Sequence, residues 1–465
     1  MFYFRKKTIA LFFGCALLTT LSRALCAADS EVFKTLDFRE VIKNAKDKVF
    51  PAVVFIKCLR EGHEEGKKVT REVSGSGVII TPEGELLTNW HVIDKAVEVR
   101  CLLYDGRAYS AKVVGSDKDT DLALVKLTEP AQPNDKVEGA FPHAALGDST
   151  KIKEGDFVMA MGAPWGLSRS VSMGIISCTR RYLPANSEYS LWLQSDASIS
   201  PGNSGGPLVN TDGEVIGINS RGVIFGGDMG FAVPSETITF VVAQLREHGK
   251  MRWSWTGLQL QALRDFNKNM YFAEQEGVIV ADTDPESPAR RAGLQPLDRI
   301  VKICGRAVTA VTEEDLPAVR RLIDGLPMHQ PAVFEIVRDG KVFAIEISPR
   351  EKGKVEGEEF DCPRWDFTVK VINQFDNPDL YFHRKEGVFI LGVKYPGNAQ
   401  RAGLQQQDII IAIDGKEVKS LADIKQIHSE LTADIAAKHR AVFTILRNGL
   451  RRQIVLDYER DYEKE

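Results

Sequence analysis

Several features that mark common classes of protein are missing from this sequence. It has no GxxxxGK[ST] loop, so its chemistry is not expected to draw on nucleotide hydrolysis. After residue 28, no apolar run approaches the roughly 18 to 20 residues that span a membrane. Five of the seven cysteines lie after residue 28, and their spacing matches no metal site. The sequence therefore predicts no bound metal and no cofactor.

The first 28 residues have a composition of their own. Three basic residues at 5–7 precede an apolar run at 8–21, which ends in small residues. This pattern is typical of a cleavable export signal, so we expect residues 1–28 to be removed and the mature protein to lack strong membrane association. Acylation at Cys26 is disfavoured because the bulky Leu25 precedes it.

Charge and composition limit the partners and the number of domains. Removing the four basic residues of the leader changes the formal net charge from −4 to −8. A negative balance disfavours binding to nucleic acid or anionic lipid, so proteins are the expected partners. A chain of 465 residues with 43% apolar side chains can build more than one core, and we expect two or three domains.

The odd number of exported cysteines leaves at least one thiol unpaired. An oxidising compartment permits a disulfide between Cys58 and Cys101. Both residues nevertheless lie in strand-like apolar runs, VVFIKCL and VEVRCLLY. We therefore favour buried free thiols over the disulfide.

The octapeptide PGNSGGPL at 201–208 places Ser204 between glycines in a turn. Glycines allow positive φ angles and bring backbone N–H groups close to a substrate carbonyl, as a nucleophile and its oxyanion-binding loop require. The same letters also fit the GxSxG elbow of an α/β-hydrolase, or a turn without chemistry. Partner residues must decide between these interpretations.

Two further segments supply candidate partners for Ser204. His91 follows a turn at 81–84 and a predicted short strand at 85–88, and it is the candidate general base. Asp121 stands where a polar loop enters the buried run LALVKL, and it could orient an imidazole. Neighbouring Asp117 and Asp119 are expected to be solvated.

The order histidine, aspartate, serine argues against an α/β-hydrolase, in which the serine comes first. The segments TNWHVID at 88–94, DLALVKL at 121–127 and SDASISPGNSGGPL at 195–208 resemble the trypsin-like HtrA family of extracytoplasmic serine proteases, also called DegP or DegQ proteases. Flanking segments at 161–177 and 213–236 extend the resemblance. It implies a mainly β fold with a trypsin-like double β-barrel.

The resemblance also implies roles for particular residues. Asp121 would hold His91, and His91 would take the proton of Ser204 as that oxygen attacks a peptide carbonyl. The oxyanion hole would comprise Gly202, Asn203 and Ser204, with backbone N–H groups as donors. The specificity pocket would be lined by Ser198, Ile199, Ile218, Asn219 and Ser220. Since it contains no acidic residue, we expect cleavage after small to medium aliphatic residues.

After residue 250 the chain repeats itself with a period of 110 residues. RAGL at 291–294 recurs at 401–404, whereas the segments VFEIVRDG and VFTILRNG match at an offset of 109. Both copies combine predicted strands, glycine turns and a helix, and they resemble PDZ domains. Two such domains after a trypsin-like domain are typical of the two-PDZ branch of the HtrA family.

A PDZ domain binds a peptide C-terminus beside an edge strand, with loop N–H groups holding the carboxylate. By resemblance, the peptide-binding loop of the first copy is Trp255, Thr256, Gly257 and Leu258. An offset of 110 aligns it with the segment WDFT at 365–368, where the glycine is absent and Asp366 would repel a carboxylate. We therefore expect the second copy to contact another subunit or the protease domain, or simply to cover its sheet.

The predicted domain organisation follows from these patterns. It comprises a signal peptide at 1–28, a protease domain at 29–250, a first PDZ domain at 251–350, a charged linker at 351–362, a second PDZ domain at 363–458 and a charged tail at 459–465. The short stretch at 60–72, with Lys67 and Lys68, is expected to form a solvated tip, and His63 within it has no metal-binding context.

The resemblance implies an ATP-independent periplasmic serine endopeptidase that degrades misfolded or unfolded exported proteins. Chaperone activity, recognition of peptide C-termini and assembly into homotrimers or multiples of trimers are implied as well. The alternative is a proteolytically inactive chaperone or PDZ scaffold in which His91, Asp121 and Ser204 are misaligned.

Overall fold

The computed structural model describes residues 37–136, 138–164, 169–183, 187–200, 202–223, 229–264 and 276–462. The predicted leader at 1–28 and the proline at position 201 lie outside these ranges. Among the helices within them, none is long and apolar enough to cross a membrane.

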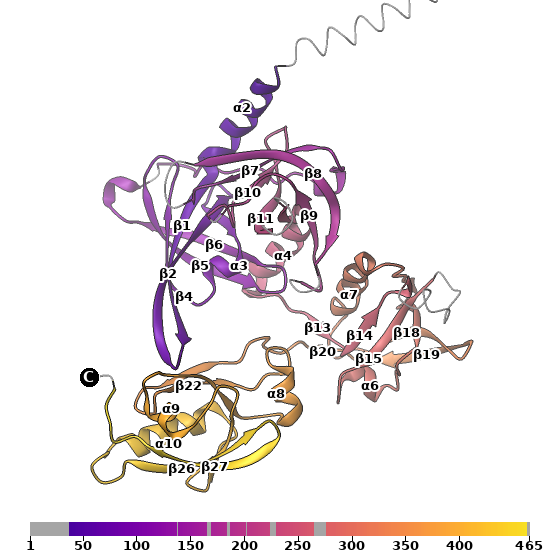
Figure 1. Ribbon diagram of the computed structural model, residues 1–465. Coiled ribbons are helices and arrows are strands. Elements are labelled where there is room, and N and C mark those ends of the chain that lie inside the picture. The colour runs from indigo at the N-terminus through magenta and orange to yellow at the C-terminus, as the bar shows by residue number, and fades with distance from the viewer. Residues whose placement is uncertain are drawn as a thin grey trace, which may run out of the picture.

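Six antiparallel strands in the N-terminal part of the chain close into a barrel in the order β1-β2-β3-β6-β5-β4 (Figure 1). The strands are β1 (Val53–Glu64), β2 (Lys67–Ile79), β3 (Glu85–Thr88), β4 (Ala96–Leu102), β5 (Ala108–Asp117) and β6 (Leu122–Pro130). Strand β6 begins with four consecutive buried residues, because one face fills the barrel and the other packs against its surroundings.

A second barrel follows in the order β10-β11-β12-β9-β8-β7. Its strands are β7 (Phe157–Gly162), β8 (Ser170–Tyr182), β9 (Leu191–Ser195), β10 (Pro207–Val209), β11 (Val215–Val223) and β12 (Met229–Pro234). One cluster of buried apolar side chains contains residues of both barrels, such as Val54 and Trp192. The predicted double β-barrel is confirmed.

One helix precedes the first barrel in the sequence, and another follows the second barrel. Helix α2 (Phe38–Val49) starts at Asp37, whose carboxylate accepts a hydrogen bond from the Arg39 N–H group. Helix α4 (Ser235–His248) follows β12 and ends at Gly249, where φ is +69°. A left-handed residue at this position favours glycine and stops the helix.

The two repeats fold into similar sheets. The first has the strand order β14-β15-β16-β18-β19, with β14 (Leu258–Gln261), β15 (Val278–Thr283), β16 (Arg299–Ile303), β18 (Ala332–Arg338) and β19 (Lys341–Ile347). The second has the order β21-β22-β23-β24-β26-β27, with β21 (Glu359–Cys362), β22 (Phe367–Val371), β23 (Val388–Val393), β24 (Ile409–Ile413), β26 (Arg440–Arg447) and β27 (Leu450–Asp457). The second sheet thus begins with one additional strand.

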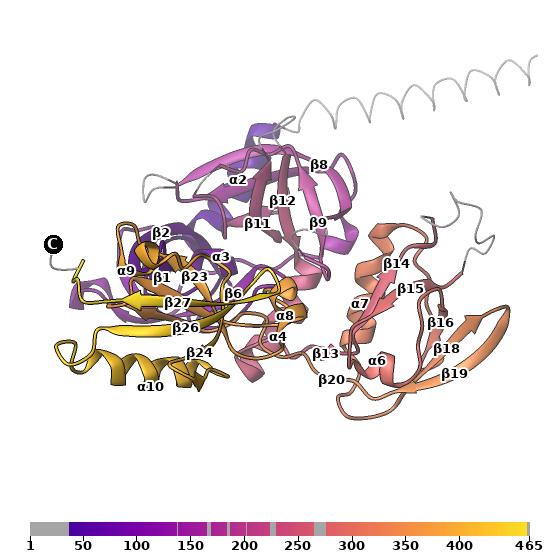
Figure 2. The same ribbon diagram turned by 60° about the horizontal axis from the view of Figure 1, so that its bottom comes forward.

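Short helices complete each repeat. The first contains α6 (Pro288–Arg291) and α7 (Leu316–Asp324), and its ends are joined by β13 (Ser254–Trp255) and β20 (Arg350–Glu351). The second contains α8 (Pro378–His383), α9 (Asn398–Ala402) and α10 (Leu421–Thr432). Figure 2 shows the two repeats as separate bodies on different sides of the barrels.

The same buried ion pair occurs in both repeats. Arg338 donates two hydrogen bonds of 2.6 Å to the two carboxylate oxygens of Asp298, which is 1% exposed. Arg447 makes the identical pair with the fully buried Asp408. A bidentate guanidinium compensates the desolvation of a buried carboxylate, so each pair fixes the turn that enters β16 or β24.

The tip of the β1–β2 hairpin contacts the second repeat, as Figure 1 shows. A Cβ atom on Gly66 would lie 2.3 Å from the backbone nitrogen of Lys394, so the two backbones are in direct contact. His63 Nδ1 lies 2.9 Å from Glu359 Oε2. The side chains of Lys67 and Lys68 are exposed as expected, but the prediction of a merely solvated tip is wrong.

A polar cluster joins the barrels to the first repeat. The Tyr189 hydroxyl donates to Asp324 at the end of α7, and Lys352 Nζ lies 3.1 Å from both the Tyr189 oxygen and Asp119 Oδ2. Burial raises the pKa of Asp324 to about 7. Asp119 is therefore an interdomain partner and not a solvated surface residue.

Asp117 was also expected to be solvated, and it is buried instead. Its carboxylate accepts hydrogen bonds of 2.9 and 2.6 Å from the N–H group and hydroxyl of Thr120. Burial, followed by the nearby Asp119 charge, raises the pKa of Asp117 to about 6. The side chain thus shapes the loop that carries Asp121.

Cys58 and Cys101 are free and buried on adjacent strands, as favoured from the sequence. Cys101 lies opposite Ile56, two residues from Cys58. Burial raises the pKa of the Cys58 thiol to about 12, so the side chain packs as a small apolar group.

Loss of the Arg338 guanidinium is expected to destabilise the first repeat. Arg338→Met leaves Asp298 buried without its partner, which costs about 3 to 5 kcal/mol. Native-state hydrogen exchange of β16 and β18 in the full chain measures this change. The control Arg306→Met alters an exposed arginine of the same repeat; equal effects of the two substitutions would contradict the assignment.

The contribution of Asp324 to folding stability is expected to fall as the pH rises. Its folded pKa of about 7 exceeds the ordinary value of 3.8, so between these values the folded state binds the proton that the unfolded state has released. Folding is therefore less favourable near pH 7 than near pH 4 for this group. Asp324→Asn removes this pH dependence. The melting temperature of the variant should therefore rise relative to that of wild type as the pH increases. Exposed Asp379→Asn should show no such gain.

Candidate active site

The two barrels bring His91, Asp121 and Ser204 to their common boundary. His91 lies on α3 (Trp90–Ile93) directly after β3, and Asp121, with φ of +55°, is the last residue before β6. Ser204 lies in the loop before β10, so it comes from the second barrel. His91 Nδ1 is 2.9 Å from both carboxylate oxygens of Asp121. This pairing can fix the tautomer of the imidazole and leave Nε2 as a proton acceptor.

Asp121 is held from several sides. Its Oδ1 also accepts from the backbone N–H group of His91 at 3.1 Å, and its Oδ2 accepts from the Ser220 hydroxyl at 2.5 Å. The Asn89 side-chain amide donates to the Asp121 carbonyl at 3.0 Å. These bonds fix the orientation of a carboxylate whose side chain is only 4% exposed. They explain why the left-handed backbone at this aspartate is tolerated.

Ser204 faces Ser220 in this conformation. Its hydroxyl donates to the Ser220 carbonyl oxygen at 3.0 Å, and within the described residues no hydrogen bond joins it to His91. The imidazole side chain is 34% exposed, so its free edge is open to solvent. A rotation of the serine side chain would be needed to make the nucleophile–base hydrogen bond, which often forms only in the substrate complex.

The loop of Ser204 is fixed by a residue of the first barrel. The Ser76 hydroxyl donates to the Gly202 carbonyl at 2.5 Å, and the Ser76 N–H group donates to the Ser204 carbonyl at 2.8 Å. Ser76 is fully buried. Because Ser76 of the first barrel binds both carbonyls, these hydrogen bonds fix the orientation of the Ser204 loop relative to the first barrel.

The N–H groups of Gly202 and Ser204 have no acceptor among the described residues. Gly202 has φ of +103°, which side-chain-bearing residues rarely adopt. The Asn203 N–H group differs, since it donates to the Ser200 carbonyl at 2.9 Å, and the Asn203 side chain accepts from the Ser170 hydroxyl. Of the three predicted oxyanion-hole residues, two therefore have donors available to a ligand.

The five predicted pocket residues divide into two groups. Ser198 is exposed and Ile199 half-buried, and a Cβ atom on Gly230 would lie 2.7 Å from the Ile199 side chain. Ile218 and Asn219 are fully buried, and the Asn219 amide donates to the Pro207 carbonyl at 3.0 Å. The side chains of Ile218 and Asn219 are thus closed to solvent in this structure.

The hydroxyl of the fifth predicted pocket residue, Ser220, donates to the Asp121 carboxylate. The sequence analysis therefore missed Ser220 as a partner of the carboxylate. It also missed Ser76 and Ser170 as supports of the Ser204 loop. Lone serines in strand-like runs give no local signal for such long-range contacts.

Trp255 is the last residue of β13, Thr256 and Gly257 form the loop that follows, and Leu258 is the first residue of β14. Gly257 has φ of +74°, and the N–H groups of Thr256 and Gly257 donate no hydrogen bond among the described residues. Strand β14 pairs only with β15, so its other edge has no strand partner within the described part of the chain. A strand edge next to two available N–H groups can accept an extended peptide with its carboxylate.

The alignment of the two loops at an offset of 110 is wrong by one residue. The carbonyls of Gly257 and Asp366 accept from Asp284 and Lys394, respectively, which makes Asp366 the counterpart of Gly257. Asp366 adopts a φ of +59°, and its buried carboxylate accepts from the Asn398 N–H group at the start of α9. The chain between this loop and the end of the next strand is one residue longer in the second repeat.

A cavity of about 760 Å³ lies beside the first loop. It is lined by Gly257 and Leu258 from the loop and strand, by Ile323 from α7, by Tyr189 from the barrels and by Tyr381 from α8 of the second repeat. The open edge of β14 therefore faces a space that all three parts of the chain enclose.

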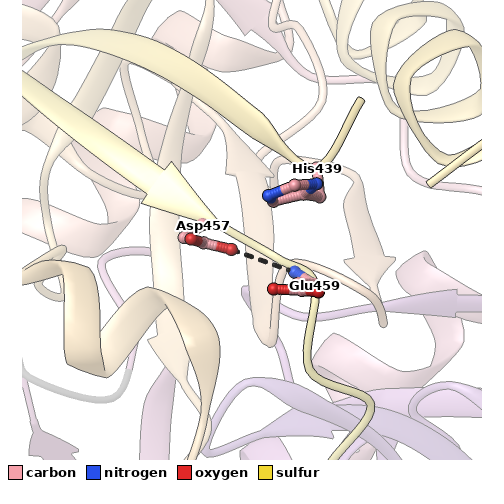
Figure 3. A group of neighbouring side chains, drawn as sticks. All are labelled: His439, Asp457 and Glu459. Carbon is pink, nitrogen blue, oxygen red and sulfur yellow. Dashed lines mark hydrogen bonds between the residues drawn. The ribbon is translucent and has the colours of Figure 1, made fainter. Parts of the chain in front are cut away.

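Figure 3 shows a separate group of His439, Asp457 and Glu459 in the second repeat, whose ligand atoms lie within 4.8 Å of one another. Asp457 already pairs with Arg440 at 2.9 Å and accepts from the Glu459 N–H group. The guanidinium supplies the positive charge at this carboxylate, and we assign the group no function.

Comparison with known proteins agrees with this architecture. Residues 75–218 match the trypsin-like peptidase domain family, and residues 246–323 and 389–430 match PDZ domain families. A probable periplasmic serine endoprotease, DegP-like, from Marinomonas sp. (strain MWYL1) is 35% identical over 82% of this chain and 78% of that protein. The corresponding protein of Halomonas elongata is 33% identical over 82% of this chain and 78% of its own length.

Solved structures give the same result. The HtrA-type protease AlgW with tripeptide has a TM-score of 0.59 and 31% identity, covering 67% of this chain and 97% of that one. A serine endoprotease from Yersinia pestis has a TM-score of 0.51 and 28% identity, covering 67% of this chain and 98% of that one. The resemblance inferred from the sequence is thereby confirmed, and the chain belongs to the HtrA/DegP family of periplasmic serine endoproteases, with a trypsin-like peptidase domain and two PDZ domains.

Proposed function

We propose that Ser204 is the nucleophile of this endoprotease, His91 its general base and Asp121 the residue that orients His91. The observation that carries this proposal is the 2.9 Å pairing of His91 Nδ1 with a buried Asp121 carboxylate, at the boundary where Ser204 also lies. The neutral imidazole donates its Nδ1–H group in the hydrogen bond to Asp121, so its Nε2 atom is free to accept the serine proton.

The reaction begins when the Ser204 side chain turns from the Ser220 carbonyl to His91. Its oxygen attacks the peptide carbonyl carbon while its proton passes to Nε2, and Asp121 stabilises the imidazolium that results. The N–H groups of Gly202 and Ser204 then bind the oxyanion of the tetrahedral intermediate, where one donor is typically worth roughly 3 to 4 kcal/mol. Collapse releases the amine, which takes the proton from His91, and water hydrolyses the acyl-enzyme by the same steps.

The substrates are unfolded or misfolded exported proteins, cleaved after small to medium aliphatic residues. The sequence has no phosphate-binding loop that could drive unfolding, so the substrate must arrive as an extended chain. Ser198 and Ile199 remain the candidates for the pocket, and neither supplies the negative charge that would select lysine or arginine. Holding such chains before cleavage is a chaperone activity, and assembly in trimers is expected of this family.

The first PDZ domain captures peptide C-termini. Supporting this are the two available N–H groups of Thr256 and Gly257, the open edge of β14 and the adjoining cavity. The related AlgW protease has been solved with a tripeptide and with a decapeptide. The carboxylate would lie on the loop and the last side chain in the cavity beside Ile323.

Replacement of Ser204 by alanine is expected to abolish proteolysis. Removing the nucleophile of a serine protease lowers kcat by roughly a million-fold, far below detection with an unfolded casein-like substrate. Mass spectrometry of the wild-type fragments also identifies the residue that precedes each cleaved bond. We expect this residue to be valine, alanine or leucine.

The matched control for this experiment is Ser110→Ala, which alters an exposed serine on β5. It should cleave casein as fast as wild type. Cleavage by Ser204→Ala at the wild-type rate would exclude Ser204 as the nucleophile, and fragments ending in arginine would exclude the aliphatic pocket.

Peptide binding to the first PDZ domain should require glycine at position 257. A Cβ atom there would lie 2.2 Å from the Ser287 Cβ atom and would disturb the loop N–H groups. Loss of one hydrogen bond to a carboxylate corresponds to about 1.5 to 3 kcal/mol, so Gly257→Ala should bind roughly 10- to 100-fold more weakly. Fluorescence anisotropy of a labelled decapeptide ending in valine measures this in the Ser204→Ala background.

Gly340→Ala is the control, because this glycine of the same domain has φ of +73° with nothing within 4 Å of its added Cβ atom. It carries the same backbone strain without the clash. Equal affinities of the two variants would show that the loop at 257 does not hold the peptide.

A further inference from the structure

The additional strand of the second PDZ domain lies where a peptide ligand would lie. Strand β21 pairs antiparallel with β22, with Phe360 opposite Val369 and Cys362 opposite Phe367. Strand β22 is the counterpart of β14, since each directly follows the loop that carries Gly257 or Asp366. In the first domain, β14 has no strand at this edge within the described residues.

One face of β21 fills the space between β22 and α10. The Phe360 ring is 6.0 Å from the His428 ring in an edge-on arrangement, and Lys425 Nζ lies 5.4 Å from the Phe360 ring centre. Cys362 is fully buried in the core of the domain. Alternate side chains entering pockets beside a helix are the hallmark of an extended peptide added to a PDZ domain.

The loop N–H groups bind the end of β21. Trp365 N donates to the Cys362 carbonyl oxygen at 2.9 Å, and Asp366 N is shared between the carbonyls of Cys362 at 3.0 Å and Pro363 at 3.2 Å. The equivalent donors of the first domain, Thr256 N and Gly257 N, have no acceptor among the described residues. The Cys362 carbonyl thus holds the position that a terminal carboxylate would take.

We propose that residues Glu359–Cys362 are an internal ligand of the second PDZ domain, which occupies its peptide groove and closes it to other peptide ends. The Cys362 side chain takes the place of the last residue of a ligand and Phe360 the place of the residue two before it. Because Pro363 continues the chain, the occupant reaches the loop with a carbonyl instead of a carboxylate.

The opposite face of β21 contacts the protease domain. Glu359 lies 2.6 Å from Lys95 Nζ and 2.9 Å from His63 Nδ1, and Asp361 accepts from the Lys68 N–H group. The occupant is therefore bound on both faces, by the groove on one side and by the β1–β2 hairpin on the other. This double contact holds the second PDZ domain against the hairpin tip.

A tethered occupant competes strongly with free peptides. A ligand joined by a short linker reaches an effective concentration in the millimolar range, about a thousandfold above a peptide added at micromolar concentration. The second PDZ domain is thereby excluded from substrate capture as long as β21 stays in place, and the first domain provides the available groove.

Hydrogen exchange of the full chain, with its second PDZ domain unaltered, tests the occupancy directly. In the Ser204→Ala protein, the N–H groups of Trp365 and Asp366 should exchange as slowly as those of β26. The N–H groups of Thr256 and Gly257, which have no acceptor among the described residues, should exchange faster than those of Trp365 and Asp366. Fast exchange at both loops would overturn the proposal.

A variant that releases β21 tests the groove itself. Phe360→Asp removes the ring that packs against His428 and should release β21 from the groove, whereas Leu450→Asp makes the same kind of change at an exposed site of the domain. The probe is a labelled peptide KVEGEEFDC, residues 354–362 with a free carboxylate, carrying benzoylphenylalanine in place of the phenylalanine. Cross-links to β22 and α10 are mapped by mass spectrometry.

We expect almost no cross-links in this groove for wild type and Leu450→Asp. For Phe360→Asp we expect a cross-link yield at least about tenfold higher. Equal cross-linking of wild type would show that the groove is open, which overturns the proposal. The absence of cross-links in a Phe360→Asp protein whose 359–362 amides exchange fast would show that the groove is no peptide site. None of these outcomes depends on cleavage by Ser204.

Discussion

The active site depends on hydrogen bonds that cross from one barrel to the other. The Ser204 loop belongs to the second barrel, yet Ser76 of the first barrel binds the carbonyls of both Gly202 and Ser204. Ser220 makes the reverse connection, because it comes from β11 and binds Asp121 at the start of β6. A small relative shift of the barrels would therefore move Ser204, the proposed nucleophile, away from His91. The shared apolar core between the barrels opposes such a shift.

Backbone N–H groups are the donors that we propose for recognition at three places in this chain. At 202–204 two of them are available to an oxyanion, and at 256–257 two are available to a carboxylate. At 365–366 the corresponding two are already bound to the Cys362 carbonyl. Since every residue but proline carries an N–H group, the difference lies in backbone conformation and in what reaches the donors. Glycine adopts the required positive φ angle at 202 and 257, and a buried aspartate adopts it at 366.

The sequence predicted those features that depend on local patterns. A turn at 81–84 and a polar loop ending at 121 place His91 and Asp121 next to strands, and the two repeats follow from the recurrence at 110 residues. The double barrel was implied by the resemblance of three segments to the HtrA family. Asp298 and Arg338 recur in the second repeat as Asp408 and Arg447, but their pairing was not predicted. What the sequence did not predict are contacts between distant segments, such as Ser220 with Asp121 or Glu359 with His63. A single serine or glutamate carries no local signature of its partner.

The alignment of the two repeats by letter is wrong by one residue at the peptide-binding loop. A constant offset of 110 aligns Trp255 with Trp365, whereas the hydrogen bonds align Thr256 with Trp365. The tryptophan matched by letter is thus one position closer to the strand, fully buried beside Phe443 and His428. Packing of this ring and of Cys362 into one core brings β21 into the groove. The loss of a glycine at 366 and the gain of a strand at 359–362 are therefore two parts of one structural change, by which a domain of this repeated fold contains its own ligand.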